Sequence, residues 1–238
     1  MEMLFDVKGK VARKVAKFQE MKKQRGVTLL EIIIVLGIIG IIAAGVVILA
    51  QRAFTAQDLS DVQDNLTSVR TAMNEAYKDQ ANYPKPTNSV IGLTKSTITD
   101  STVVNDAPIV TLVRMGKIAP DEAFNGFSND AFQIDQAKTD STSSQFKGFT
   151  VLVNGLAADE CRNLISQMGN QWDYVEAVKA GASAGKEFAG LTGRGLDTAV
   201  STTVLKTLIS GDISPDKIVA AGVCDGDGSV NGVIFGSK

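Results

Sequence analysis

Glu31 is the residue whose type and setting point most directly to chemistry. It is the single charge among the 24 residues from Val27 to Ala50. A carboxylate at the centre of a membrane helix costs about 2.5–3.5 kcal/mol, so it needs a partner or a nearby interface. Glu31 either reaches the lipid headgroups near one end of the span or meets a cation. Cleavage after Gly26 would supply that cation, because Val27 would then carry a free α-amine with Glu31 as the fifth residue of the product.

The chain has no histidine and two cysteines, Cys161 and Cys224. Without histidine, Ser-His and Cys-His nucleophiles and His-ligated zinc are excluded, and two thiols cannot build a site that needs four thiolates. The cysteines can form one disulfide at most, or remain as buried free thiols. We therefore expect no cofactor, no metal site and no enzymatic activity.

Three acidic clusters invite a catalytic or metal-binding interpretation, and a simpler role fits each of them better. Asp121-Glu122 and Asp159-Glu160 lie beside predicted helix starts, where the helix dipole favours carboxylates. The loop from Asp225 to Ser229 alternates oxygen-bearing side chains like a calcium loop. It lacks the glycine and the glutamate that an EF-hand needs at its sixth and twelfth positions, so we expect a turn.

Charge is divided unevenly along the chain, although the formal net charge is only −2. Residues 1–26 carry eight Lys and Arg against three Asp and Glu, and the rest of the chain is acidic. The overall balance argues against a nucleic-acid-binding protein dominated by phosphate contacts. A length of 238 residues with 44% hydrophobic residues indicates a folded chain of one or two domains.

Residues 32–50 form an uncharged apolar run of 19 residues. Extended back to Val27, the run would make a helix of about 36 Å, enough to cross a hydrocarbon layer of about 30 Å. A soluble core helix would show a polar face, and a secretory signal would have a shorter apolar region and a small-residue cleavage site. Basic residues before the run predict a cytoplasmic N-terminus and a body in an oxidising compartment, where the cysteines could pair.

Beyond Ala50 the hydrophobic pattern becomes that of a helix with one buried face. The apolar residues recur at spacings of three and four: Leu59, Val62, Leu66, Val69, Met73 and Ala76. We expect one helix from near Val27 to near Gln80, with a membrane half (27–50), an amphipathic half (51–80) and a globular head (81–238) after it. A free coiled-coil dimer is the alternative, but the seam lasts less than three heptads.

The rest of the chain predicts mixed helices and antiparallel strands, an α+β class. We expect a loop over 85–105, a short helix from Asp106 to near Gly116, a strand over 149–153 closed by a turn at Asn154-Gly155, a helix over 157–168, a strand over 172–178, a helix from Asp197 to Leu208, a short helix at Ser214-Pro215 and a strand over 230–235.

The N-terminal motif resembles the class III signal of type IV prepilins. It reads Arg25-Gly26-Val27-Thr28-Leu29-Leu30-Glu31, after a basic leader and before the apolar run. The resemblance implies that a membrane prepilin peptidase cuts after Gly26 and methylates the new amine of Val27. It also implies that Glu31 serves subunit pairing during assembly. A leader of 26 residues, and Val27 where Phe is commonest, are similar to the type IVb subfamily.

Four further segments resemble the toxin-coregulated, longus and CFA/III pilins, which are major type IVb pilins: residues 42–53, 82–84, 112–123 and 154–165. This resemblance implies the type IV pilin fold, a long N-terminal helical spine packed on an antiparallel β-sheet head with short helices. It implies a disulfide between Cys161 and Cys224. It also implies that the helix loosens at Gly37, Gly40 and Gly45 in the filament, and tight packing of an intact helix is the alternative.

The function implied by the resemblance is that of the major structural subunit of a type IVb pilus, a surface filament for adhesion, bacterial aggregation and colonisation. Its partners would be further copies in a helical homopolymer, the prepilin peptidase/methyltransferase, the inner-membrane assembly platform, the outer-membrane secretin, and a host-cell or bacterial surface. The prepilin would span the inner membrane once with its head in the periplasm, and the mature form would lie in the extracellular pilus. A pseudopilin of a type II secretion system is the alternative.

Overall fold

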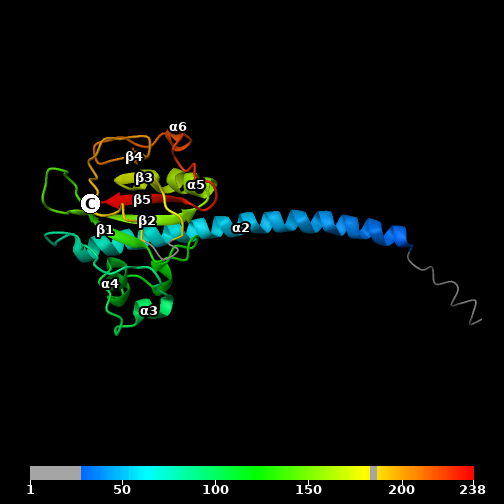
Figure 1. Cartoon of the computed structure of the whole chain (residues 1–238), viewed down its shortest axis with the longest axis horizontal. Helices are drawn as coiled ribbons and strands as arrows, with labels where there is room; N and C mark the ends of the chain where they lie inside the picture. Colours follow the sequence, from blue (N-terminus) through cyan, green and yellow to red (C-terminus); the bar gives the residue numbers. More distant parts are fainter. Residues whose placement is uncertain (1–27, 183–186) are drawn as a thin grey trace, which may run out of the picture. The chain divides into compact units, whose positions relative to one another are not determined.

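The structure is a computed structural model that describes residues 28–182 and 187–238. The chain divides into two compact units, Met1–Ala53 and Phe54–Lys238, with the boundary inside the long helix α2. The elements follow in the order α2 (Leu29–Tyr77), α3 (Lys95–Thr99), α4 (Pro108–Arg114), η1 (Pro120–Ala123), β1 (Gln133–Ala137), β2 (Gly148–Leu156), α5 (Ala158–Met168), η2 (Gly169–Gln171), β3 (Tyr174–Lys179), β4 (Val204–Lys206), α6 (Pro215–Ile218) and β5 (Asn231–Ser237) (Figure 1).

Helix α2 begins directly after Thr28, which caps it. The Thr28 hydroxyl accepts a hydrogen bond from the Glu31 N–H at 3.2 Å, and the Thr28 carbonyl accepts one from the Ile32 N–H at 3.1 Å. A threonine at this position satisfies a backbone donor that the first helical turn leaves without a partner. The single long helix predicted from the sequence is confirmed, with a length of 49 residues.

Within the second unit, α2 buries one stripe of its surface in the head. The predicted seam is confirmed, since Leu59, Val62, Leu66, Val69 and Met73 are buried and Ala76 is partly buried in the main core. Residues at these spacings share one helical face, so the polar positions between them stay at the surface.

The head is built on a five-stranded sheet in the order β1-β2-β5-β3-β4, with antiparallel pairing between the named strands. The last strand, β5, is drawn red in Figure 1 and lies between β2 and β3. Phe235 of β5 pairs with Val151 of β2 and with Val175 of β3, and all three belong to the core cluster that holds the α2 stripe. The chain therefore closes its sheet only when its final residues have docked.

The opposite face of the sheet is also covered. Side chains alternate between the two faces of a strand, and Leu152, Tyr174 and Ile234 belong to a second buried cluster. Leu191 and Leu196, from the segment between β3 and β4, complete that cluster. Burial on both faces explains why β2 and β5 are apolar with little polar alternation.

The predicted helix from Asp197 to Leu208 is wrong. The segment contains β4 and turns instead. Asp197 does not cap a helix, because its carboxylate accepts hydrogen bonds from the backbone N–H and the hydroxyl of Ser141 at 2.9 and 3.0 Å. The segment is rich in Thr and Val, whose β-branched side chains lose rotamer freedom in helices and fit strands better.

The predicted turn at Asn154-Gly155 is also wrong. Strand β2 continues to Leu156 through a register shift after Val153, which is a β-bulge. Gly155 has a φ of +75°, and its N–H donates to the Ala180 carbonyl at 2.8 Å. The positive φ required glycine, but the strand does not reverse there.

Other expected elements are present with shifted ends, and several short ones escaped the sequence reasoning. Helices α4, α5 and α6 and strands β3 and β5 fall where helices and strands were predicted, and Gly116 follows α4 with a φ of +68°. Helix α3 lies within residues 85–105, where a loop was predicted, and β1 was not foreseen.

Candidate assembly helix and disulfide-bonded head

Glu31 lies in the first turn of α2 and its side chain is exposed. Its backbone N–H is held by the Thr28 hydroxyl. A carboxylate in this turn is favoured by the helix dipole, whose positive end is the N-terminus. The predicted cleavage and methylation residues, Gly26 and Val27, lie outside the described residues.

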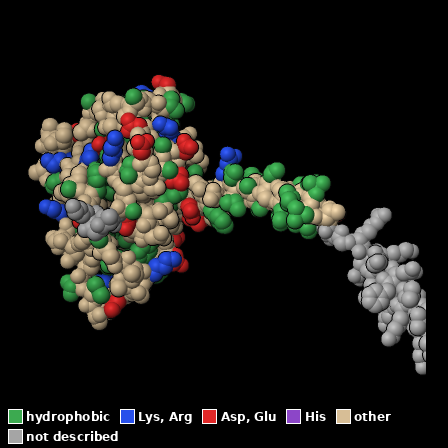
Figure 2. Space-filling view, turned by 45° about the vertical axis from the view of Figure 1, so that its right-hand side comes forward, with side chains coloured by type: hydrophobic (Ala, Val, Ile, Leu, Met, Phe, Trp, Pro, Cys, Tyr) green, Lys and Arg blue, Asp and Glu red, His purple; other side chains and the backbone are tan. Residues whose placement is uncertain are grey.

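The first half of α2 presents apolar side chains on every side. Leu29 and Ile41 are 80% and 77% exposed, and Leu49 at the far end is 66% exposed. Figure 2 shows apolar side chains along this part of the helix. The helix is long and apolar enough to cross a membrane, with a best window of mean hydropathy 3.3 and 0% of that window buried. Burying one Leu or Ile side chain yields about 1.5–3 kcal/mol, so this surface strongly favours lipid or protein over water.

Gly37, Gly40 and Gly45 lie within this exposed half, and the helix runs through all three without a break. A Cβ atom built at any of them would meet no atom within 4 Å. Each glycine weakens a helix by about 1 kcal/mol relative to alanine. No packing contact within the described chain therefore calls for glycine here. Loosening of the helix in a filament stays a prediction.

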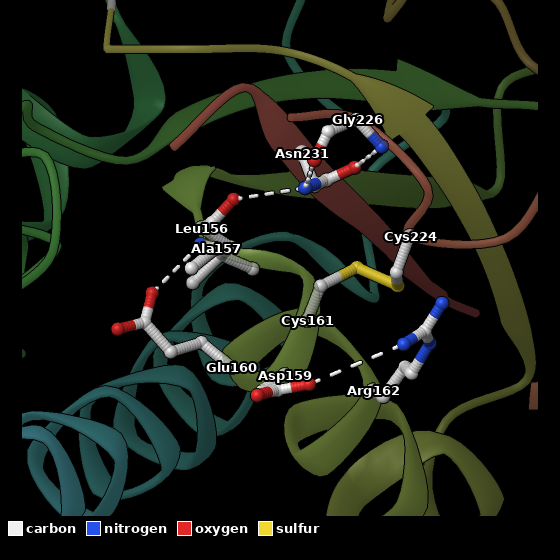
Figure 3. Close-up of a disulfide and its surroundings, with 9 residues drawn as sticks. All are labelled: Leu156, Ala157, Asp159, Glu160, Cys161, Arg162, Cys224, Gly226 and Asn231. Atoms are coloured by element: carbon white, nitrogen blue, oxygen red, sulfur yellow. Dashed lines mark hydrogen bonds and ion pairs between the residues drawn. A yellow bond between two sulfur atoms is a disulfide. The ribbon is translucent and has the colours of Figure 1, made fainter. Parts of the chain in front are cut away.

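The two cysteines form a disulfide that joins α5 to the segment before β5 (Figure 3). Cys161 and Cys224 lie 63 residues apart in sequence, with their Cα atoms 5.8 Å apart. Both are buried, at 0% and 4% exposure. This is the pairing that the resemblance implied, and it removes the alternative of free thiols. The bond anchors the loop that leads into the central strand.

The Asn231 side chain fixes the same loop at its C-terminal end through three hydrogen bonds. The Asn231 amide oxygen accepts a hydrogen bond from the Gly226 N–H at 2.8 Å. The Asn231 amide nitrogen donates to the carbonyls of Gly226 and Leu156 at 3.0 and 3.2 Å (Figure 3). A Cβ on Gly226 would lie 2.8 Å from the Asn231 oxygen, so a side chain at this position would displace the Asn231 amide. Disulfide and asparagine together fix residues 224–231 against the end of β2.

The acidic clusters have the structural roles expected from the sequence. Glu160 accepts a hydrogen bond from the Ala157 N–H at 2.7 Å and thereby caps α5. Glu122 accepts one from the Ala119 N–H at 2.7 Å at the start of η1. In the Asp225–Ser229 loop, Asp225 accepts from a backbone N–H and lies 3.8 Å from the Lys179 ammonium. Within the described ranges, no group of three His, Cys, Asp or Glu side chains could hold a metal ion.

Arg70 joins α2 to the end of the central strand β5. This contact was not foreseen from the sequence. The guanidinium lies over the Trp172 ring at 5.0 Å and donates to the Ser237 hydroxyl at 3.0 Å. It also donates to the Gln171 carbonyl at 2.5 Å and lies 3.8 Å from the Asp173 carboxylate. The sequence placed Arg70 on a polar face of the helix, and one arginine there gives no signal of such a contact.

Asp106 ties the start of α4 to the preceding loop. Its carboxylate accepts hydrogen bonds from the Thr87 hydroxyl at 2.7 Å, from the Thr87 N–H and from the Asn88 N–H. These hydrogen bonds, the Thr87 hydroxyl first, hold the pKa of Asp106 below its usual value. The Asp106 carboxylate is therefore ionised at neutral pH, the form that accepts these hydrogen bonds.

Comparison with known proteins concerns both regions of the chain. The family model described as "Prokaryotic N-terminal methylation motif" matches residues 21–47, and that described as "Toxin-coregulated pilus subunit TcpA" matches residues 111–230. A toxin coregulated pilin of Vibrio cholerae serotype O1 is 32% identical over 201 residues, which cover 84% of this chain and 83% of that protein. The chain belongs to the toxin-coregulated pilin family. A second Vibrio cholerae toxin coregulated pilin is 35% identical over 173 residues, covering 72% of this chain and 70% of that one.

The fold of the pilin agrees with a solved relative. The crystal structure of TcpA, a type IV pilin from the Vibrio cholerae El Tor biotype, superposes with a TM-score of 0.54 at 23% identity, covering 76% of this chain and 99% of that one. By its family models and sequence relatives, the chain is a homologue of toxin-coregulated pilin, a major type IVb pilus subunit with a prepilin processing motif. This family consists of structural pilin subunits and not of enzymes. Membership implies polymerisation and processing by prepilin peptidase.

Proposed function

We propose that this pilin is cut between Gly26 and Val27, methylated on Val27, and polymerised through the first half of α2 into a type IVb surface filament. The observation that carries the proposal is the exposure of apolar side chains all around residues 29–50, next to a single acid in the first helical turn. In the prepilin, lipid covers this apolar surface, and in the filament a bundle of identical helices buries it.

In that bundle, Glu31 of an incoming subunit pairs with the Val27 amine of a neighbour. Either charge alone in apolar surroundings is costly, whereas the two together neutralise each other. Because Glu31 lies in the first turn of the helix, the pair fixes the axial position of one subunit against the next. Cleavage is required first, since it creates the amine.

The basic leader places the N-terminus in the cytoplasm and the head in the periplasm before assembly. We assign an inner-membrane assembly platform and an outer-membrane secretin as partners in export. We assign adhesion to a host-cell surface, bacterial aggregation and colonisation as roles of the filament. The resemblance to type IVb pilins supports these assignments.

Sequencing the N-terminus of protein sheared from intact cells tests the proposal. We expect N-methylvaline followed by Thr-Leu-Leu-Glu, recovered from long fibres visible by electron microscopy. Sheared protein that begins at Met1, or a shed monomer that lacks residues 27–50, would overturn it. A filament map would also test the glycine prediction, since unbroken helical density through Gly40 contradicts loosening.

A further inference from the structure

Residues 187–196, which we name the strap, run along the free edge of β1. The Gln133 side-chain amide donates to the Phe188 carbonyl at 2.9 Å and accepts from the Phe188 N–H at 3.1 Å. The backbone of β1 is also used, since the Gln136 carbonyl accepts a hydrogen bond from the Gly193 N–H at 3.2 Å. Further along, the Lys138 N–H donates to the Arg194 carbonyl at 2.8 Å. β1 is the first strand in the sheet order and therefore an edge strand. The strap uses hydrogen-bonding groups that an edge strand would otherwise offer to another chain.

Leu196, at the end of the strap, packs against Gly148 and Gly236 on the face of the sheet that carries the second buried cluster. The side chain is fully buried. A Cβ on Gly148 of β2 would lie 2.8 Å from one Leu196 methyl carbon, and a Cβ on Gly236 of β5 would lie 2.7 Å from the other. Contacts that short do not occur, so a side chain at either position would displace the buried leucine. The strap thus covers the face of the sheet as well as its edge.

Arg194 locks the strap to a distant strand. Its guanidinium donates to the carboxylate of Glu176 on β3, which also accepts a hydrogen bond from the Tyr174 hydroxyl at 2.7 Å. Glu176 is buried at 7% exposure. Burial, and then the neighbouring carboxylate, raise the pKa of Tyr174, so its hydroxyl remains a donor at neutral pH. Removing one member of a buried charge pair leaves the other uncompensated, which is strongly destabilising.

We propose that the strap is an edge guard, a segment that opens as a unit when the Arg194–Glu176 pair is lost and that keeps β1 from pairing with β1 of a second copy. The attachments of the strap to the sheet all fall within ten residues of chain, so the strap is a local unit whose opening need not unfold the head. A second copy is the partner, because every copy carries the same edge strand, and β1 pairs with a named strand on one side only. Within one chain the strap covers this edge, where the buried Asp135 carboxylate accepts a 2.6 Å hydrogen bond from the Thr192 hydroxyl. The proposal does not depend on the function proposed above.

Hydrogen exchange on the full-length pilin in detergent micelles tests the lock. Glu176→Gln keeps the size of the side chain and removes its charge. Lys95→Met is the matched control, since it removes an exposed ion pair with Asp121. We expect peptides over 187–196 and 133–138 to exchange at least about tenfold faster in Glu176→Gln, with peptides of β2 and β5 unchanged. Uniform acceleration across the head, or none, would overturn the proposal.

A second variant tests the guard and leaves both residues of the lock, Arg194 and Glu176, in place in the sequence. Leu196→Asp places a charge in the buried space against Gly148 and Gly236 and thereby displaces the strap. At high protein concentration and constant detergent ratio, we expect this variant to form a dimer absent in the wild type and in Lys95→Met. In that dimer, the β1 peptide should regain its protection from exchange. A dimer in which β1 stays unprotected, or a strap that opens without any dimer, contradicts the role as a guard.

Discussion

The two halves of α2 share one continuous helical backbone and differ completely in what their side chains touch. Residues 29–49 are exposed and carry no charge other than that of Glu31, with Leu29 at 80% exposure. Residues 59–77 carry a narrow apolar stripe, and Leu66 and Val69 on it are fully buried in the head. The first half must find its partners outside the chain, whereas the second finds them inside. Side-chain pattern, more than helix propensity, decides which half serves assembly and which serves folding.

The largest effect is expected from the one acid of the first half. Glu31→Val should leave prepilin stable and processed but abolish filaments, because the Val27 amine of a neighbouring subunit would lose its counter-charge. Electron microscopy of surface fibres and N-terminal sequencing of membrane protein measure the two outcomes separately. Asp79→Val, an exposed acid beyond the end of α2, is the control and should leave piliation normal. Normal piliation in Glu31→Val would refute the pairing.

Loss of the disulfide should affect the head and spare the assembly half. Replacing Cys161 and Cys224 together by Ala should lower the free energy of unfolding of the head by about 4 kcal/mol, as the chain-entropy model gives for a loop of this size. Denaturant unfolding in micelles, followed by Trp172 fluorescence, measures it. Membrane insertion and cleavage after Gly26 should not change. An unaltered unfolding midpoint would show that Asn231 alone fixes the loop.

A matched pair of truncations sharpens the contrast within the helix itself. Leu66→Ala should destabilise the head by about 2–5 kcal/mol, because it leaves a cavity among fully buried side chains. Ile39→Ala, in the exposed half, should change head stability by less than about 0.5 kcal/mol. The same unfolding assay in micelles compares them. Comparable losses in both variants would mean that the two halves do not differ in the way their exposure indicates.

The features of α2 could be read from sequence because each is periodic or continuous. The apolar run and the 3-4 seam extend over many residues, so a single exception does not hide them. The helix predicted from Asp197 to Leu208 was wrong because that prediction depended on a single residue and not on a repeated pattern. An acid at its start suggested a cap, but the carboxylate binds Ser141, which is 56 residues away, and no local pattern reports a distant contact.

The residues of the candidate site also fall into two groups: those that a local sequence pattern indicates, and those whose partners are distant in sequence. Gly26, Val27 and Glu31 could be proposed as site residues from the sequence because the motif that contains them is contiguous. Arg70 and the strap are not, since their partners come from strands far along the chain: Ser237 is 167 residues from Arg70. The two glycines under Leu196, Gly148 and Gly236, lie just outside the strands predicted over 149–153 and 230–235, and the sequence assigned them no role. Their purpose is visible only when β2, β5 and the strap are placed together.

The smallest effect in the isolated chain is expected from the glycines, which occur in the first half of α2 and not in the second. Gly40→Ala should strengthen the helix by about 1 kcal/mol, and amide exchange around residue 40 in micelles should slow accordingly. Ala44→Gly should have the opposite effect, and the double variant should return to the wild-type rate.

The same double variant separates the two roles that the glycines could have in a filament. If the helix must loosen there, Gly40→Ala should reduce piliation and Ala44→Gly should restore it, because helix stability is what matters. If Gly40 instead lets another helix approach closely, the added methyl group remains a clash and Ala44→Gly restores nothing. Rescue in the fibre count therefore supports loosening, and failure of rescue with a normal exchange rate contradicts it.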